Sequence, residues 1–483
     1  MLTFLQDNFW QLLIIINYFL VVITVFSIVL NNLNPTKTLS YLLLLITLPY
    51  VGLLIYYFFG QEYRKNKIFK RKNVMNQKRI KKWQREIQLS KNRIETIKDE
   101  EVKEEIKLIK LLYKNQEVAP LTEHNKLTVL INGDAKYKSL FKDIAQAQRT
   151  VHLEYYIIKD DEIGTKLIDL LCEKASRGVE VRISYDSVGS RLSGKTKRKL
   201  RKSQVECYPF MPVHFSKLTS KINYRDHRKI AVIDGKIGYV GGINISDTYL
   251  GKEGFWRDTH LRIEGEAVNS LQLYFMLNWD FVTDYDVVIE DHFFPETEVK
   301  EKTAVQIAAS GPDTDWANIM EVIFTAITTA EKYVYISTPY FIPNDEIIMA
   351  LTAAAKSGVK VKLIIPRGSD SWAAKYATYS FIDLLLKAGV EVYFYTRGFI
   401  HAKVMIVDDI FTTIGTSNMD YRSFNINFEI NALVYNEEIA KIVRNSFEED
   451  LKGSKQIKAE DWENRKLIQK LKESFCRLWA PLL

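Results

Sequence analysis

A pattern of five fixed residues occurs twice in this 483-residue chain. The first copy runs from His227 to Asn244 and the second from His401 to Asn418. Both copies read His-x-Lys, four residues, Asp, six residues, Gly-x-x-Asn. Five positions that each match about one time in twenty recur by accident roughly once in a few million start points. The repeat therefore constrains the chain to contain two copies of one structural unit.

Each copy is predicted to place its histidine and its lysine on one face of a strand. His227 and Lys229 stand two apart in an apolar, β-branched run, as do His401 and Lys403, and side chains two apart in a strand share a face. An ammonium and an amide beside an imidazole make a phosphate site that contains a nucleophile. The alternative, two core histidines with a shared strand pattern, explains one copy more easily than two. The catalytic candidates are His227, Lys229, Asp234, His401, Lys403 and Asp408, and the substrate-binding candidates are Asn244, Asn418 and Ser417.

The aspartate of each copy is expected to hold a turn. Asp234-Gly235 is a strong signal for a two-residue hairpin, and Asp408-Asp409 is a weaker one. By strand parity, each carboxylate points away from the histidine of its own copy. Although Asp234 and Asp408 belong to the repeated pattern, we expect their role to be structural more than chemical.

The segments that precede the two copies also share an order of elements. Each set reads as strand, helix and strand before its His–Lys hairpin. The first set comprises residues 151–158, a helix from Gly164 and residues 178–185, and the second comprises residues 334–342, a helix from Asn344 and residues 358–365. We therefore predict an α/β chain, with one repeat over residues 116–300 and another over residues 301–483.

The N-terminal 60 residues are predicted to form a transmembrane hairpin. Residues 10–30 and 39–59 are each about 20 residues long and contain no Asp, Glu, Lys or Arg. Two such stretches in tandem, joined by a short Asn/Pro turn, favour membrane spans over core helices. No positive charge precedes the first stretch, which argues against a cleaved signal peptide.

The positive charge of the chain is concentrated beside these spans. Residues 61–115, predicted to be a basic helical connector, hold 18 Lys and Arg against 8 Asp and Glu, whereas the whole chain has a net charge of +8. The remainder is therefore close to neutral, which argues against a nuclease with a basic groove on its body. The positive-inside rule places the connector, the catalytic body and both termini in the cytoplasm. A basic segment beside a membrane also favours anionic lipid.

Two further features of the sequence remain outside the pattern. A second basic cluster, residues 195–202, fits either an exposed helix or the border of an anionic substrate site. Cys172, Cys207 and Cys476 have no histidine partners at ligand spacing. We therefore expect reduced thiols and no zinc site.

With its duplicated His-x-Lys-x4-Asp pattern, the chain resembles the phospholipase D superfamily over residues 116–483. The resemblance implies two repeats, each a mixed sheet flanked by helices, packed as a pseudo-dimer around one active site. It implies that one histidine attacks phosphorus and forms a phosphohistidine, while the other protonates the leaving alcohol and deprotonates the acceptor; the usual order in the family makes His227 the nucleophile. It also implies a carboxylate downstream of each motif that holds the unreactive ring nitrogen, and the matching residues are Asp258 and Glu429.

Within that superfamily, the layout is similar to that of the bacterial cardiolipin synthases, with two N-terminal spans, a basic connector and two motifs. The likeness is carried by residues 185–190, 241–245, 415–424 and 478–483. It implies transfer of a phosphatidyl group between two phosphatidylglycerol molecules at the cell membrane, giving cardiolipin and glycerol. It implies no metal, no nucleotide cofactor and no nucleic-acid partner, because the lysines and asparagines of the motifs neutralise the phosphate.

Other functions are compatible with the same residues. A membrane phospholipase D would hand the phosphatidyl group to water and release phosphatidic acid, and another phosphatidyltransferase would use a different acceptor. An inactive lipid-binding scaffold is a third interpretation, although intact histidines and lysines in both copies speak against it. The sequence sets no oligomeric state.

Overall fold

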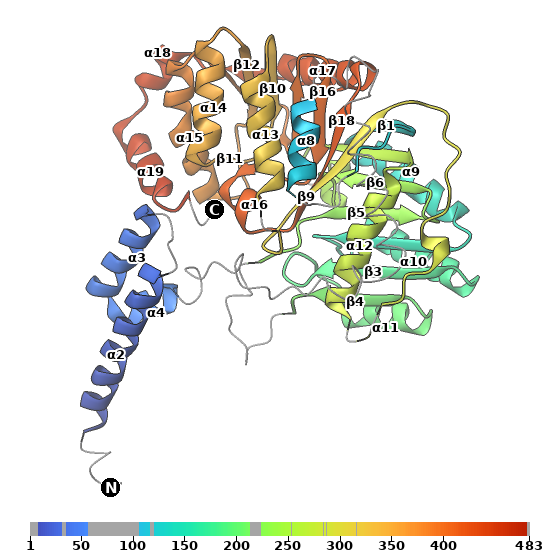
Figure 1. The fold of residues 1–483 in the computed structure, drawn as a ribbon, viewed down its shortest axis with the longest axis horizontal. Helices are drawn as coiled ribbons and strands as arrows, with labels where there is room; N and C mark the ends of the chain where they lie inside the picture. Colours follow the sequence, from blue (N-terminus) through green and yellow to red (C-terminus); the bar gives the residue numbers. More distant parts are fainter. Residues whose placement is uncertain are drawn as a thin grey trace. The chain divides into compact units, whose positions relative to one another are not determined.

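The computed structural model describes residues 8–30, 35–56, 106–115, 120–212 and 224–480, except residues 253, 284, 286 and 315. The chain divides into two compact units, residues 1–66 with 213–224 and residues 67–212 with 225–483 (Figure 1).

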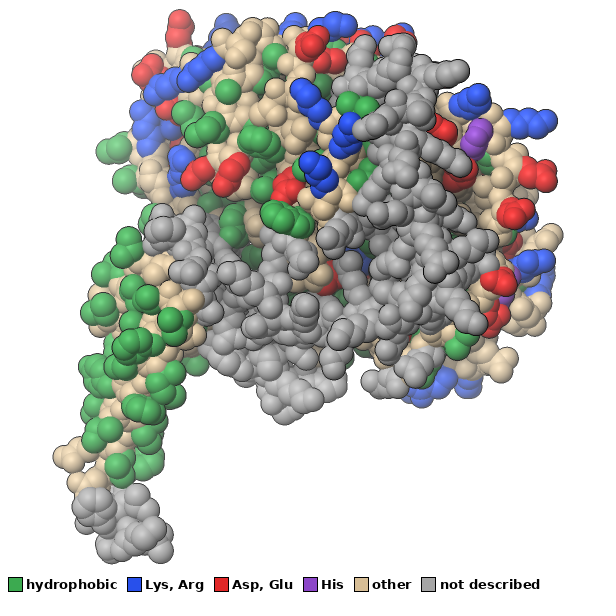
Figure 2. All heavy atoms as spheres, in the orientation of Figure 1, with side chains coloured by type: hydrophobic (Ala, Val, Ile, Leu, Met, Phe, Trp, Pro, Cys, Tyr) green, Lys and Arg blue, Asp and Glu red, His purple; other side chains and the backbone are tan. Residues whose placement is uncertain are grey.

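The first unit contains one long apolar helix. α2 (Phe9–Leu30) is long and apolar enough to cross a bilayer, and no other helix among the described residues meets both conditions. Figure 2 shows hydrophobic side chains over its surface. The predicted second span over residues 39–59 is wrong as a single helix, because α3 (Pro35–Thr47) ends just before Pro49 and α4 (Pro49–Ile55) begins there. Proline lacks an N–H donor and its ring clashes with the preceding turn, so the helix is interrupted. Residues 57–59 lie outside the described residues.

Most of the predicted basic connector lies outside the described residues, but its last part forms helix α8 (Ile106–Lys114). Leu108, Ile109 and Leu112 are fully buried on one side of α8. They belong to a hydrophobic core that also contains side chains of α13 (Asn318–Thr329). The end of the connector is therefore part of the second unit.

The first repeat is built on a seven-stranded mixed sheet with the order β1-β8-β6-β5-β2-β3-β4. Its strands β2, β3 and β4 are parallel, and the remaining pairs are antiparallel. The strands are β1 (Asn125–Ile131), β2 (Thr150–Tyr155), β3 (Glu180–Asp186), β4 (Glu206–Phe210), β5 (Lys229–Ile233), β6 (Ile237–Gly241) and β8 (Thr259–Gly265). The helices are α9 (Asn132–Gln146), α10 (Glu162–Ser176), α11 (Gly194–Lys202) and α12 (Val268–Val282).

The second repeat is built on an eight-stranded mixed sheet with the order β19-β13-β12-β10-β15-β16-β18-β9. The strands are β9 (Ala304–Ser310), β10 (Tyr333–Ser337), β12 (Lys360–Pro366), β13 (Glu391–Tyr395), β15 (Val404–Val407), β16 (Phe411–Gly415), β18 (Glu429–Tyr435) and β19 (Ser454–Gln456). Besides α13, the helices are α14 (Asp345–Lys356), α15 (Trp372–Lys387), α16 (Tyr421–Asn425), α17 (Glu437–Lys452), α18 (Ala459–Glu463) and α19 (Leu467–Arg477).

The two sheets share one order of strands. Taken in chain order within each repeat, the first strand lies at one edge, the hairpin that follows the histidine lies in the middle, and the parallel strands lie beyond it. The second sheet differs by the added edge strand β19, which pairs antiparallel with β13. One hydrophobic core takes side chains from both sheets, among them Ile230 and Leu261 from the first and Ile406 and Ile430 from the second. This shared core places the two repeats side by side (Figure 1).

The two motif aspartates occupy equivalent turns. Asp234 and Asp408 both have a φ of 53°, in the left-handed region. The Asp234 carboxylate accepts N–H bonds from residues 148–150 at 2.7–2.9 Å. The Asp408 carboxylate accepts N–H bonds from residues 331–333 at 2.6–2.9 Å. Each aspartate therefore ties a hairpin turn to the loop that enters the neighbouring strand, β2 or β10.

Asp408→Ala should lower the free energy of unfolding by about 1–2 kcal/mol, because three N–H groups lose their acceptor at once. Thermal or denaturant unfolding in detergent measures the change. Asp383→Ala is the matched control, since that carboxylate forms an exposed pair with Lys387 and should contribute a few tenths of a kcal/mol. Equal unfolding midpoints for the two variants would contradict the structural role.

Candidate active site

The two motif histidines meet at the boundary between the repeats. The short strand β14 (Phe399–Ile400) pairs in parallel with β7 (Trp256–Arg257) of the first repeat. The backbone N–H of His401 then donates to the carbonyl of Arg257 at 2.7 Å. In the equivalent place, the N–H of His227 donates to the carbonyl of Phe428 at 3.0 Å. The backbone of each histidine is thus held by a residue of the other repeat, and that residue stands directly before Asp258 or Glu429.

The imidazole rings follow the same crossed arrangement. Nδ1 of His227 bonds to the Glu429 carboxylate at 2.9 and 3.0 Å, and Nδ1 of His401 bonds to Asp258 at 2.7 Å. Both carboxylates are fully buried. These are the two carboxylates, each downstream of one motif, that the family resemblance implies, and the structure pairs each with the histidine of the opposite repeat. An Nδ1–H that donates to a carboxylate leaves Nε2 as the basic, reactive nitrogen.

Each motif lysine contacts the backbone of the histidine in its own motif. Nζ of Lys229 donates to the carbonyl of His227, and Nζ of Lys403 donates to the carbonyl of His401, both at 2.6 Å. Burial lowers the pKa of Lys229 to about 7 and that of Lys403 to about 8. A buried ammonium of this kind favours a nearby anion, because the anion offsets its cost of desolvation.

The asparagines of both motifs line the same pocket as the two histidines. Asn244 is held from two sides: its Oδ1 accepts the N–H of Ile157 at 3.1 Å, and its Nδ2 donates to the Tyr249 hydroxyl at 2.8 Å. Ser417 does not line this pocket; it borders a separate small cavity beside Lys403. Its hydroxyl donates to the carbonyl of Asn418 at 3.2 Å. Lys403 borders the same small cavity, and the prediction that Ser417 contacts substrate stays a prediction.

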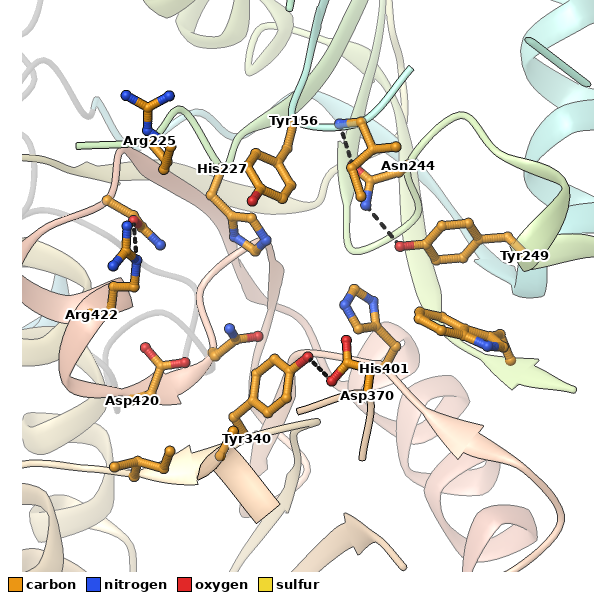
Figure 3. Close-up of a pocket in the computed structure, with 16 residues that line it drawn as sticks. Tyr156, Arg225, His227, Asn244, Tyr249, Tyr340, Asp370, His401, Asp420 and Arg422 are labelled. Carbon is orange, nitrogen blue, oxygen red and sulfur yellow. Dashed lines mark hydrogen bonds between the residues drawn. The ribbon is translucent and has the colours of Figure 1, made fainter. Parts of the chain in front are cut away.

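The shared pocket is a cavity of about 400 Å³. Figure 3 shows both imidazoles directed into it, with Tyr156, Arg225 and Arg422 on the side of His227. On the side of His401 lie Tyr249, Tyr340 and Asp370, and Trp256 packs against the ring at 5.3 Å between centroids. The motif aspartates Asp234 and Asp408 do not line the cavity.

The sequence analysis missed most of these lining residues. Arg422 lies within the run 415–424 that carried the family likeness, and Arg225 lies two residues before the first motif histidine. A signal for these two was therefore present. Tyr340 and Asp370 belong to loops of the second repeat and share no motif with the histidines. Among the described residues, no group of three or more His, Cys, Asp or Glu is arranged to hold a metal ion.

The two half-sites differ in how they support their carboxylates. The Thr416 hydroxyl donates to Oε2 of Glu429 at 2.5 Å. The equivalent residue of the first motif is Gly242, where a Cβ would lie 2.2 Å from Oδ1 of Asp258. Asp258 instead accepts the N–H of Thr259 at 2.7 Å. The shorter side chain, Asp258, thus requires a glycine beside it, and the longer side chain, Glu429, is supported by a hydroxyl.

Burial controls the protonation of both imidazoles. It lowers the pKa of His227, although Glu429 opposes the shift, and it lowers the pKa of His401 to about 4. Burial also works against ionisation of Glu429, but the electrostatic attraction and hydrogen bond of His227 and the charge of Lys229 hold the pKa of this carboxyl below its ordinary value. Both shifts favour the neutral, basic form of the imidazole near neutral pH.

Acid should destabilise the protein through His401. Its pKa is about 4 in the folded protein and about 6.5 when unfolded, so the unfolded chain binds the proton more readily. The contribution of His401 to stability is present above pH 6.5 and is lost as the pH falls through 4. His401→Asn should reduce the acid-induced loss by up to about 3 kcal/mol.

Unfolding in detergent between pH 7 and pH 4 measures this effect. Part of the acid destabilisation should remain in the variant, because burial also lowers the pKa of His152 and His260. The same change at the partly exposed His292 is the control. Parallel pH profiles for wild type and His401→Asn would contradict the assignment.

Comparison with known proteins agrees with this geometry. A family model described as "Cardiolipin synthase, PLD-like domain" matches residues 140–270 and 323–451, and one described as "Phospholipase_D-nuclease N-terminal" matches residues 19–61. The cardiolipin synthase of Halalkalibacterium halodurans is 40% identical over 491 residues, which cover 99% of this chain and 96% of the relative. Cardiolipin synthase 2 of Bacillus anthracis is 39% identical over 461 residues, which cover 94% of this chain and 88% of the relative.

Among solved structures, the phosphatidylserine synthase of Haemophilus influenzae matches with a TM-score of 0.60 at 15% identity. The match covers 78% of this chain and 100% of that one. At this identity the likeness speaks for the fold alone, and it agrees with two phospholipase D-like sheets. The family model and the near full-length relatives lead to one conclusion: the chain belongs to the cardiolipin synthase family, whose catalytic body consists of phospholipase D-like domains.

Proposed function

We propose that this chain makes cardiolipin by transferring a phosphatidyl group from one phosphatidylglycerol to another, with release of glycerol. The observation that carries the proposal is the pair of imidazoles in one pocket, each bonded through Nδ1 to a carboxylate of the opposite repeat. Membership of the cardiolipin synthase family supports the choice of donor and product.

The proposed reaction consists of two displacements at phosphorus. In the first, Nε2 of one histidine attacks the donor phosphodiester and the P–O bond to the glycerol headgroup breaks. The other histidine starts this step as an imidazolium, a form that the negative charge of the bound phosphodiester favours, and gives its Nε2 proton to the leaving oxygen. In the second, the acceptor hydroxyl gives its proton to that same histidine while its oxygen attacks phosphorus, and the P–N bond breaks. No oxidant or further reactant is needed.

The surrounding residues have separate tasks in this scheme. Glu429 and Asp258 hold the two rings in the reactive tautomer and stabilise an imidazolium when it forms. Lys229, Lys403, Asn244 and Asn418 are the proposed phosphate ligands, and the negative charge of a bound phosphodiester favours the charged form of each lysine. The amide of Asn244 has two N–H donors, of which Tyr249 accepts one.

We infer that α2 attaches the chain to the cell membrane, where its substrate lies. Its 22 residues are almost entirely apolar, and that length is sufficient to cross the hydrocarbon core of a bilayer. The basic residues 61–115 follow in the sequence, and the positive-inside rule favours a cytoplasmic position for them and for the catalytic body. The apolar residues Val21, Ile28, Leu45 and Tyr56 pack together, so α3 and α4 contact this anchoring helix.

Hydrolysis by a phospholipase D is the competing function, because water can replace the acceptor in the second displacement. With detergent-dispersed phosphatidylglycerol as the only lipid, glycerol release should match cardiolipin formed, with little phosphatidic acid. Mass spectrometry of the lipids and an enzymatic glycerol assay measure both products. Phosphatidic acid as the main product would show that the chain is a hydrolase, and no product at all would favour the inactive scaffold.

Glu429→Gln and Asp258→Asn should each lower the rate of cardiolipin formation by about 10²–10⁴-fold, because a neutral amide neither fixes the tautomer nor stabilises the imidazolium. Initial rates at saturating phosphatidylglycerol measure the loss. Glu448→Gln, an exposed change on α17, is the control and should leave the rate close to that of wild type. A rate near the wild-type value in either test variant would contradict the role given to these carboxylates.

A further inference from the structure

A tyrosine and an aspartate form a hydrogen-bonded pair in the wall of the active-site pocket. The Tyr340 hydroxyl donates to Oδ1 of Asp370 at 2.6 Å, and both residues line the pocket on the side of His401 (Figure 3). Burial raises the pKa of the Tyr340 hydroxyl, and the charge of Asp370 adds to this effect. The hydroxyl therefore keeps its proton and remains a donor. The two proposed displacements give neither residue a task.

The carboxylate of Asp370 has capacity for further hydrogen bonds. Among the described residues, its side-chain donors are the hydroxyls of Tyr340 and, at 3.4 Å, of Ser369, and both bond to Oδ1. An ionised carboxylate accepts at about four positions on its two oxygens. Asp370 is an exposed residue, so a ligand in the pocket is able to reach Oδ2.

Asp370 also lies near the groups that surround His401. Burial lowers the pKa of Lys403, which donates to the backbone of His401, and Asp370 is one of the acids whose charge opposes that shift. Burial raises the pKa of the Tyr249 hydroxyl, and the charge of Asp370 adds to the increase. The Tyr249 ring packs against the His401 imidazole at 5.8 Å between centroids. The carboxylate therefore faces the part of the pocket in which His401 acts.

The first repeat lacks this pair. The strand pairs β2–β5 and β10–β15 align the two repeats, and they make Ile157 the residue equivalent to Tyr340. The loop after β3, residues 187–193, corresponds to the loop after β12 that carries Asp370, and none of its described residues lines the pocket. An aliphatic side chain thus stands where the second repeat presents a hydroxyl and a carboxylate.

The chemistry beside His401 fits a ligand that carries hydroxyl groups. A carboxylate accepts hydrogen bonds from hydroxyls and repels an anion such as phosphate. Trp256, whose ring lies 5.3 Å from the His401 imidazole between centroids, adds an apolar face for a short carbon chain. The headgroup of phosphatidylglycerol ends in such a unit, a three-carbon chain with two free hydroxyls.

We infer that Asp370 and Tyr340 form a polyol site, which binds the glycerol unit of the headgroup. Oδ2 of Asp370 accepts the hydroxyl on the carbon next to the one that bears the reacting oxygen, and Tyr340 orients the carboxylate. The inference rests on the proposed function.

One polyol site serves both displacements. In the first, the glycerol unit is the leaving group, and in the second it is the end of the acceptor lipid. In both, a hydroxyl stands on the carbon next to the reacting end. The site also lies beside His401, the histidine to which the family resemblance gives the exchange of protons with the alcohols. Asp370 is therefore a residue that selects glycerol over other alcohols.

The test lets labelled glycerol and 1-propanol compete as acceptors, with detergent-dispersed phosphatidylglycerol as the donor. 1-Propanol has the same carbon chain and a reacting hydroxyl, but it lacks the neighbouring hydroxyl. A site that hydrogen-bonds a substrate hydroxyl rejects the analogue without it, so the wild-type enzyme should prefer glycerol. Asp370→Ala should reduce this preference about ten- to a hundredfold, because a charged acceptor is lost. Mass spectrometry measures the ratio of labelled phosphatidylglycerol to phosphatidylpropanol.

Two further variants and one further alcohol sharpen the comparison. Tyr340→Phe keeps the ring and the carboxylate but removes the orienting donor, and it should reduce the preference about three- to tenfold. Asp383→Ala removes an exposed carboxylate of α15 that pairs with Lys387 and should leave the ratio unchanged. 1,2-Propanediol retains the neighbouring hydroxyl, so the wild-type enzyme should prefer it to 1-propanol as well.

The outcomes separate this inference from the proposed function. A smaller preference for glycerol in Asp370→Ala supports the polyol site. An unchanged ratio overturns it at any total rate, because electrostatic support of Lys403 alone would slow transfer to both alcohols equally. If Asp370→Ala forms neither product, the ratio in Tyr340→Phe decides in the same way. A wild-type enzyme that makes cardiolipin without preferring glycerol overturns the polyol site alone, whereas one that makes no phosphatidyl product contradicts the proposed function.

Discussion

The hydrogen bonds that cross between the repeats are the interaction on which the site depends. His227 and His401 each bond through the backbone and through the ring to the opposite repeat. A buried carboxylate without such a partner would carry a large desolvation cost, and so would an imidazolium formed during the reaction. The shared hydrophobic core between the two sheets holds the repeats in the register that these bonds require. Loosening the shared core would therefore also disturb the hydrogen bonds that orient the two imidazoles.

The repeated pattern allowed much of this arrangement to be predicted. Two α/β repeats, the histidine and lysine pairs and the two carboxylates all followed from residue spacing or from the resemblance that the spacing supported. The crossed pairing did not follow, because His227 and Glu429 are 202 residues apart and nothing local in the sequence relates them. The arginines, Tyr340 and Asp370 were missed for a similar reason, since they enter the pocket from loops whose positions depend on the whole fold.

In the N-terminal segment, by contrast, the sequence predicted a feature that the structure does not contain. Residues 39–59 satisfied every compositional condition for a membrane span, yet Pro49 interrupts the helix. Hydropathy averages over a window and takes no account of the hydrogen bond that one proline removes. The role of Ser417 stays a prediction: its neighbour Asn418 lines the shared pocket, whereas Ser417 borders the small cavity beside Lys403.

The crossed carboxylates have a consequence for how such a protein could arise. A single repeat holds a histidine and a carboxylate that cannot serve each other, so on its own it would need a second copy to complete even one imidazole–carboxylate pair. Two identical copies would be related by a twofold axis, and every substitution would appear in both halves at once. Covalent fusion removes that restriction. Once both copies belong to one gene, Thr416 can differ from Gly242, and the two half-sites are free to support their carboxylates in different ways.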